Sequence, residues 1–246
     1  MVAARRERRR LERLPETYRP ADDATGYAIQ RRVMTALCGG SDDGVGGDGV
    51  GGWKIGAGGP DETPLYAPIL ADEIHASGAT LAAADFPDAL VEAEIAFRLR
   101  HDLPPRGDAY DLATVAAAVE MLPALEIYRS RYRDPGAVTQ SENLADCLAN
   151  AGLVVGDPSA GSAQDPAPSW DIDLVIDGGI REGRVLRHPV GDPRRLVVWL
   201  ANELIARGEM LRAAQVVTTG ALVLGPLGRD IRGEWRGIGV VSVRFG

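Results

Sequence analysis

The sequence predicts an α+β fold that is rich in β-strands, with a small helical part at its N-terminus. Strand-like runs outnumber helical runs in roughly the last hundred residues. No regular alternation of strand and helix is visible, so a doubly wound parallel sheet is not expected. We expect a helical segment with a glycine-rich loop over residues 1–51 and a β-rich domain over residues 52–246.

The first 52 residues contain three distinct stretches. Residues 1–20 carry seven arginines and three glutamates. Such a run is typical of a solvated helix face or a frayed arm, and contact with nucleic acid or a partner is the alternative. Asp22 and Asp23 precede apolar residues at helical spacing, which predicts an amphipathic helix over residues 22–37. Residues 39–52 are rich in glycine and aspartate and predict a mobile loop.

Short extended runs and turns dominate the remainder of the chain. Residues 91–99 alternate as a strand does, residues 112–121 have helical spacing, and residues 124–128 predict another strand. Residues 157–169 are rich in Pro, Ser, Ala and Gly and predict a loop. One clear helix is predicted over residues 193–207, where Gly208 ends it. Further strands are predicted over residues 172–176, 181–186, 215–219, 229–235 and 238–245.

The composition excludes several classes of protein. A formal charge of −8 and a pI near 5.0 argue against a nucleic-acid-binding protein. Two cysteines, Cys38 and Cys147, provide neither a disulfide framework nor metal-ligand spacing. No apolar stretch is long enough to span a membrane, and no signal-type apolar core follows the basic run. We therefore expect a cytoplasmic protein that binds neither nucleic acid nor membranes.

Lys54 is the only lysine in the chain. Lysine and arginine together number 27, so the other 26 basic residues are arginine. A guanidinium group stays charged, whereas an ammonium group can release its proton when it is buried. A single lysine among glycines and a tryptophan therefore indicates a position retained for its chemistry. The alternative is that it survives by chance at an ordinary strand position.

Three glutamates in apolar surroundings form a candidate metal site. Glu92 and Glu94 are two residues apart on a predicted strand, so their carboxylates face the same side. Glu126 lies in a second apolar run. Like charges on buried strands are costly unless a cation lies between them, and hard oxygen ligands suit Mg²⁺ or Mn²⁺. The alternative for each glutamate is an exposed position or an ion pair with an arginine.

Short segments along the chain occur in the order found in one known family. In the first half these are Gly26-Tyr-Ala-Ile-Gln30, Gly52-Trp-Lys-Ile-Gly56, Val91-Glu-Ala-Glu-Ile-Ala-Phe97, Pro123-Ala-Leu-Glu-Ile127, Ser130-Arg131 and Leu144-Ala-Asp146. In the second half they are His188-Pro189, Val198-Trp-Leu-Ala-Asn202, Thr219-Gly-Ala-Leu222 and Gly239-Val-Val-Ser-Val-Arg-Phe245. Over residues 22–245 the chain resembles the 2-keto-4-pentenoate hydratase and 4-oxalocrotonate decarboxylase family, which belongs to the fumarylacetoacetate-hydrolase-like superfamily.

The resemblance implies a metal-dependent enzyme. It places Mg²⁺ or Mn²⁺ on Glu92, Glu94 and Glu126, and Lys54 matches the active-site lysine of the family. The expected activity is that of a hydratase, a carbon–oxygen lyase, acting on a 2-hydroxydienoate or 2-oxo-alkenoate acid through a metal-stabilised dienolate. Lys54 would orient the substrate carboxylate or move a proton, and burial near the metal is expected to lower its pKa.

The resemblance also implies partners and further contacts. We expect a homo-oligomer that can associate with another enzyme of its pathway. The candidate substrate-binding residues are Trp53, Ile69, Asp146, Cys147, His188, Thr219 and Gly220, with His188 shaping a turn beside the pocket.

Two departures from the family pattern leave the reaction open. Hydratases of this family tend to carry an acidic residue where Ile69 follows Pro68 here, and the usual Ala-Asp-Asn-Ala-Ser is Ala145-Asp-Cys-Leu-Ala149. Fewer polar groups favour a decarboxylase or an enol–keto isomerase of a related 2-oxo acid. A non-catalytic partner subunit is a third reading. A hydrolase is less favoured, because His75 and His101 have no spare glutamate beside them.

Overall fold

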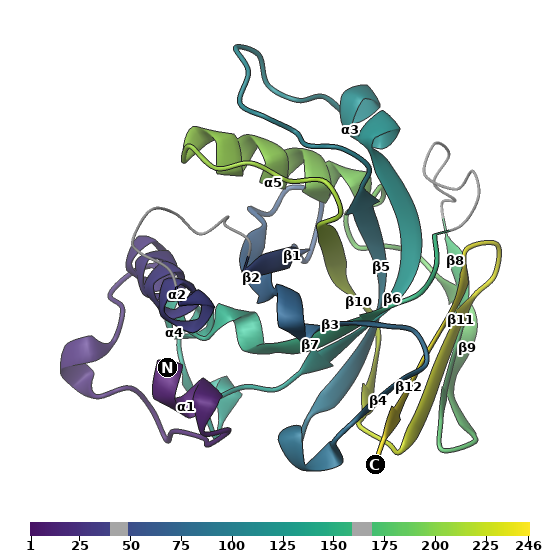
Figure 1. Ribbon diagram of the computed structural model, residues 1–246, viewed down its shortest axis with the longest axis horizontal. Coiled ribbons are helices and arrows are strands. Elements are labelled where there is room, and N and C mark those ends of the chain that lie inside the picture. Colours follow the sequence, from purple (N-terminus) through teal and green to yellow (C-terminus); the bar gives the residue numbers. More distant parts are fainter. Residues whose placement is uncertain (40–48, 159–168) are drawn as a thin grey trace.

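The computed structural model describes residues 1–39, 49–158 and 169–246. Most of the two predicted loops, residues 39–52 and 157–169, lies outside the described residues. No helix in the described ranges is both long and apolar enough to cross a membrane. Figure 1 shows two sheets with helices at one end and along one side.

The larger sheet has seven strands in the order β2-β1-β10-β5-β6-β7-β3. Their bounds are β2 Leu65–Leu70, β1 Val50–Gly56, β10 Val216–Pro226, β5 Leu90–Leu99, β6 Val119–Tyr128, β7 Asn150–Val155 and β3 Ile74–Ala76. The smaller sheet has the order β4-β12-β11-β8-β9. Its strands are β4 Ala79–Leu81, β12 Gly239–Phe245, β11 Asp230–Trp235, β8 Trp170–Ile176 and β9 Gly179–Leu186.

The seven-stranded sheet curls so that its two edges approach each other. Strand β2 at one edge contacts β7 near the other edge. On the concave face, Ile69 of β2 belongs to one buried apolar cluster with Leu122 of β6 and Leu153 of β7. Because side chains alternate along a strand, Lys54, Glu92, Glu94 and Glu126 lie on this concave face.

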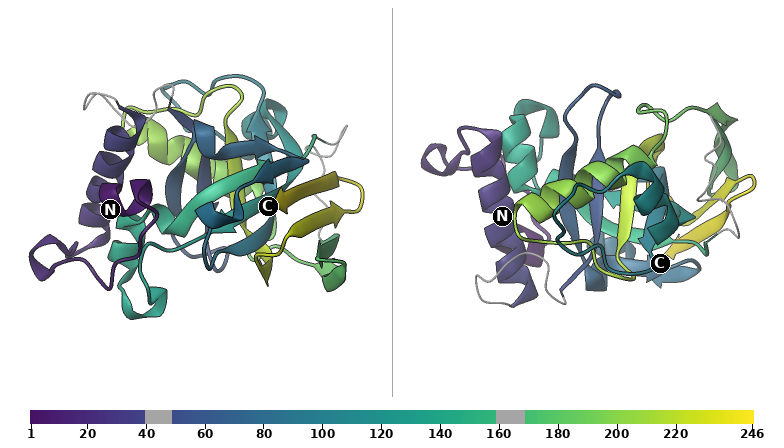
Figure 2. Two further views of the ribbon diagram at one scale, coloured as in Figure 1. Left: turned by 60° about the horizontal axis from the view of Figure 1, so that its bottom comes forward. Right: turned by 90° about the horizontal axis from the view of Figure 1, so that it is seen from above.

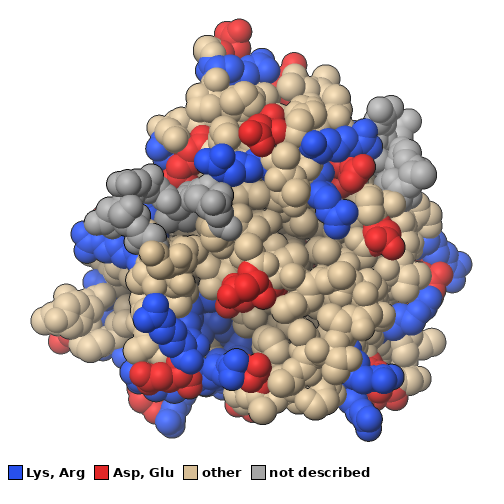
Figure 3. Space-filling model, in the orientation of Figure 1, with Lys and Arg blue, Asp and Glu red and all other residues tan. Residues whose placement is uncertain are grey.

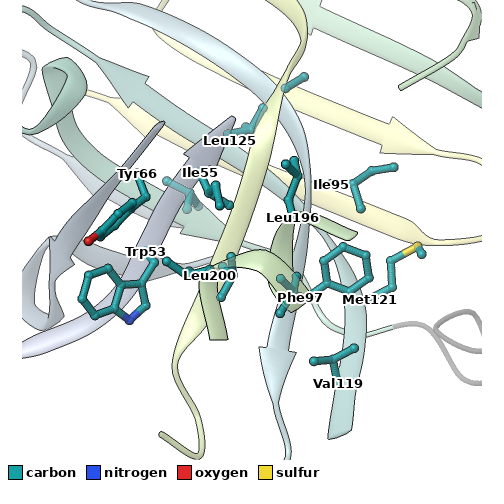
Figure 4. Packing of buried hydrophobic residues seen from close by; sticks show 14 of the residues in the cluster. Trp53, Ile55, Tyr66, Ile95, Phe97, Val119, Met121, Leu125, Leu196 and Leu200 are labelled. Carbon is teal, nitrogen blue, oxygen red and sulfur yellow. The ribbon is translucent and has the colours of Figure 1, made fainter. Parts of the chain in front are cut away.

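The convex face of the sheet carries the main apolar core. Helix α5, Arg194–Ala206, packs Leu196 and Leu200 against Trp53, Ile55 and Phe97 (Figure 4). These side chains are at most 3% exposed. The two views of Figure 2 place α5 alongside the strands, with α2 and the smaller sheet at opposite ends of the molecule. A rigid core therefore backs the strands that carry the acidic side chains.

The N-terminal part packs onto the β-rich part through helices α1 (Val2–Arg6) and α2 (Asp23–Cys38). Asp22 caps α2 by accepting a hydrogen bond from Thr25 N at 2.8 Å. Gly26 lets α2 approach α4 (Gln140–Ala145) closely, because a Cβ at this position would lie 2.6 Å from Ser141 O. Buried Gln30 donates to the carbonyl of Tyr66 and to that of Leu144 in α4.

Most arginines of the basic N-terminal run are exposed, as the sequence predicts, and Arg5 is an exception. Arg5 is almost fully buried, and its guanidinium donates to the carbonyl oxygens of Asp146 and Asn150 at 3.1 and 3.0 Å. Figure 3 shows basic side chains in a hollow below the centre of the view. A cavity of about 230 Å³ is lined by Arg5, Arg8, Arg129 and Arg131 together with acidic and apolar residues. At least Arg5 therefore has a structural role.

Two predicted boundaries are wrong for the same physical reason. The helix predicted over residues 112–121 is α3, Leu112–Ala118, and Val119 already pairs with Leu99 as the first residue of β6. The strand predicted over residues 215–219 continues as β10 to Pro226, because it pairs with β5 along that length. Pairing with a distant strand outweighs local helical spacing in the first case. Short 3₁₀ turns complete the fold, at Glu16–Tyr18, Ala71–Glu73, Ala83–Asp85, Pro135–Ala137 and Cys147–Ala149.

Candidate active site

Three carboxylates meet at the centre of the concave face. Strands β5 and β6 pair so that Glu92 lies opposite Glu126, and Glu94 is two residues further along the same face. One oxygen from each carboxylate lies within 4.8 Å of the others. Glu94 and Glu126 are 0% exposed. The register of one strand pair therefore assembles the group that the sequence predicts as metal ligands.

Lys54 reaches the same group from β1. Its Nζ donates to Glu126 Oε1 at 2.7 Å and to Glu92 Oε2 at 3.1 Å. The ammonium also lies 5.3 Å from the centre of the Tyr128 ring. The side chain of Lys54 is 12% exposed, which leaves it within reach of a ligand.

The charge of this cluster is unbalanced. Three ionised carboxylates and one ammonium leave a formal charge of −2 in a buried place. Burial and the neighbouring carboxylates raise the pKa of Glu94, and burial raises that of Glu126 despite the ammonium beside it. Burial lowers the pKa of Lys54, but the three carboxylates outweigh it and the net shift is upward. The sequence-based expectation of a lowered pKa for Lys54 is reversed in this structure.

The residues present fit a divalent cation. Its charge would balance the formal charge of −2, and the available donors are hard carboxylate oxygens. Glu94 Oε1 is buried and has no hydrogen-bond partner in the described part of the chain. Such an oxygen is costly unless a ligand contacts it. Its partner oxygen, Glu94 Oε2, accepts a hydrogen bond from Gly220 N at 2.8 Å.

Thr219 and Gly220 lie where β10 departs from regular pairing with β5. The register shifts between Thr218 and Ala221, and Gly220 has φ +104°. Thr219 Oγ1 donates to Ile95 O at 2.7 Å. His188 Nε2 lies 2.9 Å from Thr219 O. Burial lowers the pKa of His188, although the hydrogen bond to Thr219 acts in the opposite direction. The structure therefore brings these three predicted residues to one side of Glu94.

The other predicted substrate-binding residues lie further from the carboxylates or already have partners within the protein. Trp53 points to the convex face and donates to Gln215 Oε1 at 3.2 Å. Ile69 lies on the concave face, in the apolar cluster beside the site. Asp146 is fully buried and accepts from Arg131 Nε at 2.6 Å, so it serves a structural ion pair. Cys147 is buried, and burial raises the pKa of its thiol.

Asn150 is a site residue that the sequence reasoning missed. Its Nδ2 lies 3.5 Å from Glu126 Oε1, and its buried Oδ1 has no partner among the described residues. Residues 147–149 just before it all have φ between +52° and +60° without being glycine. Arg5 and Arg131 both donate to Asn150 O, at 3.0 and 2.7 Å. No local pattern signals this arrangement, because it depends on arginines far away in sequence. Tyr128, two residues after Glu126, could have been found from strand alternation.

Comparison with known proteins gives a consistent picture. No family model matches the chain. It is 30% identical over 224 residues to a 2-keto-4-pentenoate hydratase of Burkholderia vietnamiensis, covering 85% of this chain and 79% of that protein. It is 34% identical over 174 residues to the TodF product hydratase of Pseudomonas putida, covering 68% of this chain and 60% of that protein.

A solved structure shares the fold over almost the whole chain. It is the 4-oxalocrotonate decarboxylase from Pseudomonas putida G7, complexed with magnesium and adipate. The TM-score is 0.80 at 22% identity, and the superposition covers 99% of this chain and 93% of that one. The likeness confirms the predicted α+β, β-rich fold with a small helical N-terminal part.

Proposed function

Because the chain belongs to the family of 2-keto-4-pentenoate hydratases and 4-oxalocrotonate decarboxylases, we propose that it is a divalent-metal-dependent hydratase. Its substrate would be a 2-hydroxydienoate or a 2-oxo-alkenoate acid. The observation that carries the proposal is the group of Glu92, Glu94 and Glu126 with Lys54 beside it. A scaffold protein has no need of such a costly group, so an enzyme is favoured over a non-catalytic partner subunit.

Glu92, Glu94 and Glu126 are the residues that would hold Mg²⁺ or Mn²⁺. When bound, the cation supplies Lewis-acid stabilisation for the negative charge that develops on the oxygens of a 2-oxo acid. Glu94 and Glu126 are 0% exposed, so their side of the site is closed to bulk water. Glu92, whose side chain is 13% exposed, lies at the accessible side. The burial of the three side chains is the observation that supports a closed side and an accessible side of the site.

Lys54 is the residue to which we assign substrate orientation and proton transfer. Its ammonium is protonated, partly exposed and next to the carboxylates, so it can bind a substrate carboxylate or deliver a proton. In a hydratase the proton goes to the far carbon of the dienol, and water then adds to the conjugated alkene that results. The carboxylates that raise the Lys54 pKa would do so less when they are bound to a cation, which brings the proton closer to transfer at neutral pH.

A decarboxylase is the second candidate function. Ile69 lies fully buried on the concave face, and the turn at Cys147–Ala149 carries no side chain that can bind water strongly. An apolar wall beside the carboxylates favours loss of carbon dioxide from a vinylogous 2-oxo diacid over addition of water. Asn150 is a polar side chain at this wall that favours hydration.

Two substrates distinguish the candidates. The metal-loaded protein is incubated with 2-hydroxypenta-2,4-dienoate and, separately, with 2-oxohex-3-enedioate, while dienol absorbance and carbon dioxide release are followed. Loss of the dienol with one water added, and no carbon dioxide from the diacid, supports the hydratase. Carbon dioxide from the diacid without hydration of the dienoate would replace it with the decarboxylase. Turnover of neither substrate by the metal-loaded protein would contradict both assignments.

We also propose that the protein is a cytoplasmic homo-oligomer that can associate with another enzyme of its pathway. Large apolar side chains that are exposed in the single chain support self-association, among them Ile180, Val185 and Leu224. Light scattering coupled to size exclusion measures this directly. A molar mass of 26.1 kDa would contradict the oligomer.

A further inference from the structure

We propose that His188 is a positioning residue that orients Glu94 for cation binding through the single peptide unit between Thr219 and Gly220. The inference rests on the proposed metal site. Among the described residues, the hydrogen-bond partners of the His188 ring are backbone atoms of Thr219 and Val190. Its connection to Glu94 runs through the backbone of β10.

The connection consists of two short hydrogen bonds on one peptide unit. His188 Nε2 donates to the carbonyl oxygen of Thr219 at 2.9 Å. The N–H of Gly220 belongs to the same peptide unit and donates to Glu94 Oε2 at 2.8 Å. Hydrogen bonds in a chain polarise one another, so a donor at the carbonyl strengthens the N–H that holds the carboxylate.

The surroundings of the ring fix its tautomer. Thr219 O can only accept a hydrogen bond, so Nε2 must carry the hydrogen. The other ring nitrogen, Nδ1, faces Val190 N at 3.4 Å and is therefore the acceptor. Both ring nitrogens are used in the neutral form, and His188 is 4% exposed. The ring is thus held in one orientation toward β10.

Strand β10 is irregular at the place where this connection needs it. Its register with β5 shifts between Thr218 and Ala221, which frees the Gly220 N–H from the backbone ladder. Gly220 has φ +104°, a conformation that favours glycine. Thr219 Oγ1 anchors the irregular segment on Ile95 O at 2.7 Å. The N–H is therefore directed at a side chain rather than at a neighbouring strand.

The consequence falls on the second oxygen of Glu94. With Oε2 held by Gly220, Oε1 is left without a partner among the described residues and lies in the carboxylate cluster. It is the oxygen of Glu94 that a cation would take. Residues that hydrogen-bond to a metal ligand and orient it typically lower metal affinity by about 10- to 100-fold when they are lost. Loss of the His188 donor should therefore weaken cation binding.

His188 also packs edge-on against Trp170, with ring centres 6.4 Å apart. A purely structural role in this contact must be separated from the hydrogen bond. His188→Phe keeps an aromatic ring and removes the donor. His188→Gln removes the ring and keeps an N–H near the position of Nε2. His188→Leu is a second variant without a donor, and His101→Phe changes an exposed histidine whose Nδ1 lies 3.2 Å from Asp102 O.

The experiment measures the Mn²⁺ dissociation constant of the metal-free full-length protein by calorimetric titration, with the melting temperature recorded to establish folding. We expect about a 10-fold weaker constant for His188→Phe and His188→Leu, and constants close to wild type for His188→Gln and His101→Phe. Equal binding by wild type and by both variants without a donor would overturn the role of His188, and so would a loss in His188→Gln as large as that in His188→Phe. If the wild type bound no Mn²⁺, the metal site itself would fail and this role with it, which distinguishes the two failures.

Discussion

At the scale of single residues, the proposed function depends on a lysine that is surrounded by carboxylates. Lys54 lies within 3.1 Å of both Glu92 and Glu126, so any change there alters the charge of the whole cluster. Lys54→Met removes the charge and the proton, whereas Lys54→Arg keeps the charge and cannot release a proton. The pair therefore separates binding from proton transfer.

We expect Lys54→Met to lower kcat by about 10²- to 10⁴-fold, the range that a positioned acid or base contributes. Lys54→Arg should retain more substrate binding, measured as KM, while kcat stays low. Arg98→Lys, on the same strand as the glutamates but outside the cluster, is the control. If the Lys54→Met protein folds, binds Mn²⁺ and turns over substrate at the wild-type rate, Lys54 has no catalytic role.

The glutamates can be tested by removing one charge at a time. Glu94→Gln and Glu126→Gln should each weaken Mn²⁺ binding by at least about 10-fold, because each removes a charged oxygen ligand. Glu120→Gln is the matched control: it lies on β6 as Glu126 does, but pairs with Arg100. Calorimetric titration checks the prediction. Unchanged affinity in both ligand variants would show that the cation binds elsewhere.

Site residues were predictable from the sequence where one strand sufficed to place them. Glu92 and Glu94 follow from strand alternation, and Lys54 from its being the only lysine. The contact of Asn150 with Glu126 and the connection from His188 to Glu94 could not be predicted. Both depend on backbone irregularities, the turn at residues 147–149 and the shift in β10, that only long-range pairing creates.

At the scale of elements, helix α4 shows how a short helix is fixed beside the site. Thr139 and Glu142 form a reciprocal cap, and Arg13 donates to both oxygens of Glu142. The hydrogen bond from Arg13 lowers the pKa of Glu142 to about 2, against the effect of burial. Arg13 thereby anchors α4 to the N-terminal segment. The end of α4 leads into the turn before Asn150.

The lowered pKa of Glu142 predicts a pH-dependent contribution to stability. Because the carboxyl is more acidic when folded, its contribution is present above its unfolded pKa near 4.5 and is lost as the pH falls toward 2. Glu142→Gln should lower the melting temperature at pH 7 by a few degrees, since it removes the charge that pairs with Arg13 and weakens those hydrogen bonds by about 1 kcal/mol. The difference from wild type should shrink at pH 3. A constant difference at both pH values would contradict the assignment, and Glu7→Gln, at an exposed pair, is the control.

The left-handed turn at residues 147–149 predicts an unusual response to glycine. Ala149 has φ +60° and is 2% exposed, whereas Ala145 is equally buried in the helix α4. An L-residue in the left-handed region costs about 1 to 2 kcal/mol, and glycine avoids this cost. Ala149→Gly should therefore destabilise the protein less than Ala145→Gly by about that amount, measured by denaturant unfolding. An equal loss would mean that the turn stores no strain.

The elements themselves were predictable in kind but not in length. The alternation over residues 91–99 and the apolar spacing over residues 193–207 match β5 and α5 closely. Helix α3 is shorter than predicted and β10 is longer, because pairing with β5 decides where each ends. Helix α4 was missed, since its six residues are too few for a periodic pattern.

At the scale of the whole molecule, the curled sheet places four charged side chains from three strands on one concave face. Lys54 comes from β1, Glu92 and Glu94 from β5, and Glu126 from β6. The unbalanced charge is a cost to the folded state that a cation would remove. Ligands that bind only the folded protein stabilise it, so the cation should raise the melting temperature.

We expect Mn²⁺ at about 100 times its dissociation constant to stabilise the protein by about 2.7 kcal/mol. For a chain of this length that corresponds to a rise of roughly 5 to 10 °C in melting temperature. The Glu126→Gln variant, which should bind the cation at least about 10-fold more weakly, should show at most about half of this rise, and differential scanning calorimetry measures both. A wild-type melting temperature that does not change with Mn²⁺ would contradict cation binding at the buried carboxylates.

The central claim is that this chain catalyses a cation-dependent reaction of a 2-hydroxydienoate at Glu92, Glu94, Glu126 and Lys54. The most direct measurement is the turnover of 2-hydroxypenta-2,4-dienoate by wild-type protein that has been stripped with a chelator and then titrated with Mg²⁺. We predict no turnover after stripping, a saturable return as Mg²⁺ is added, and no such return in Glu94→Gln. Full turnover by the stripped wild-type protein, or an equal return in Glu94→Gln, would contradict the claim.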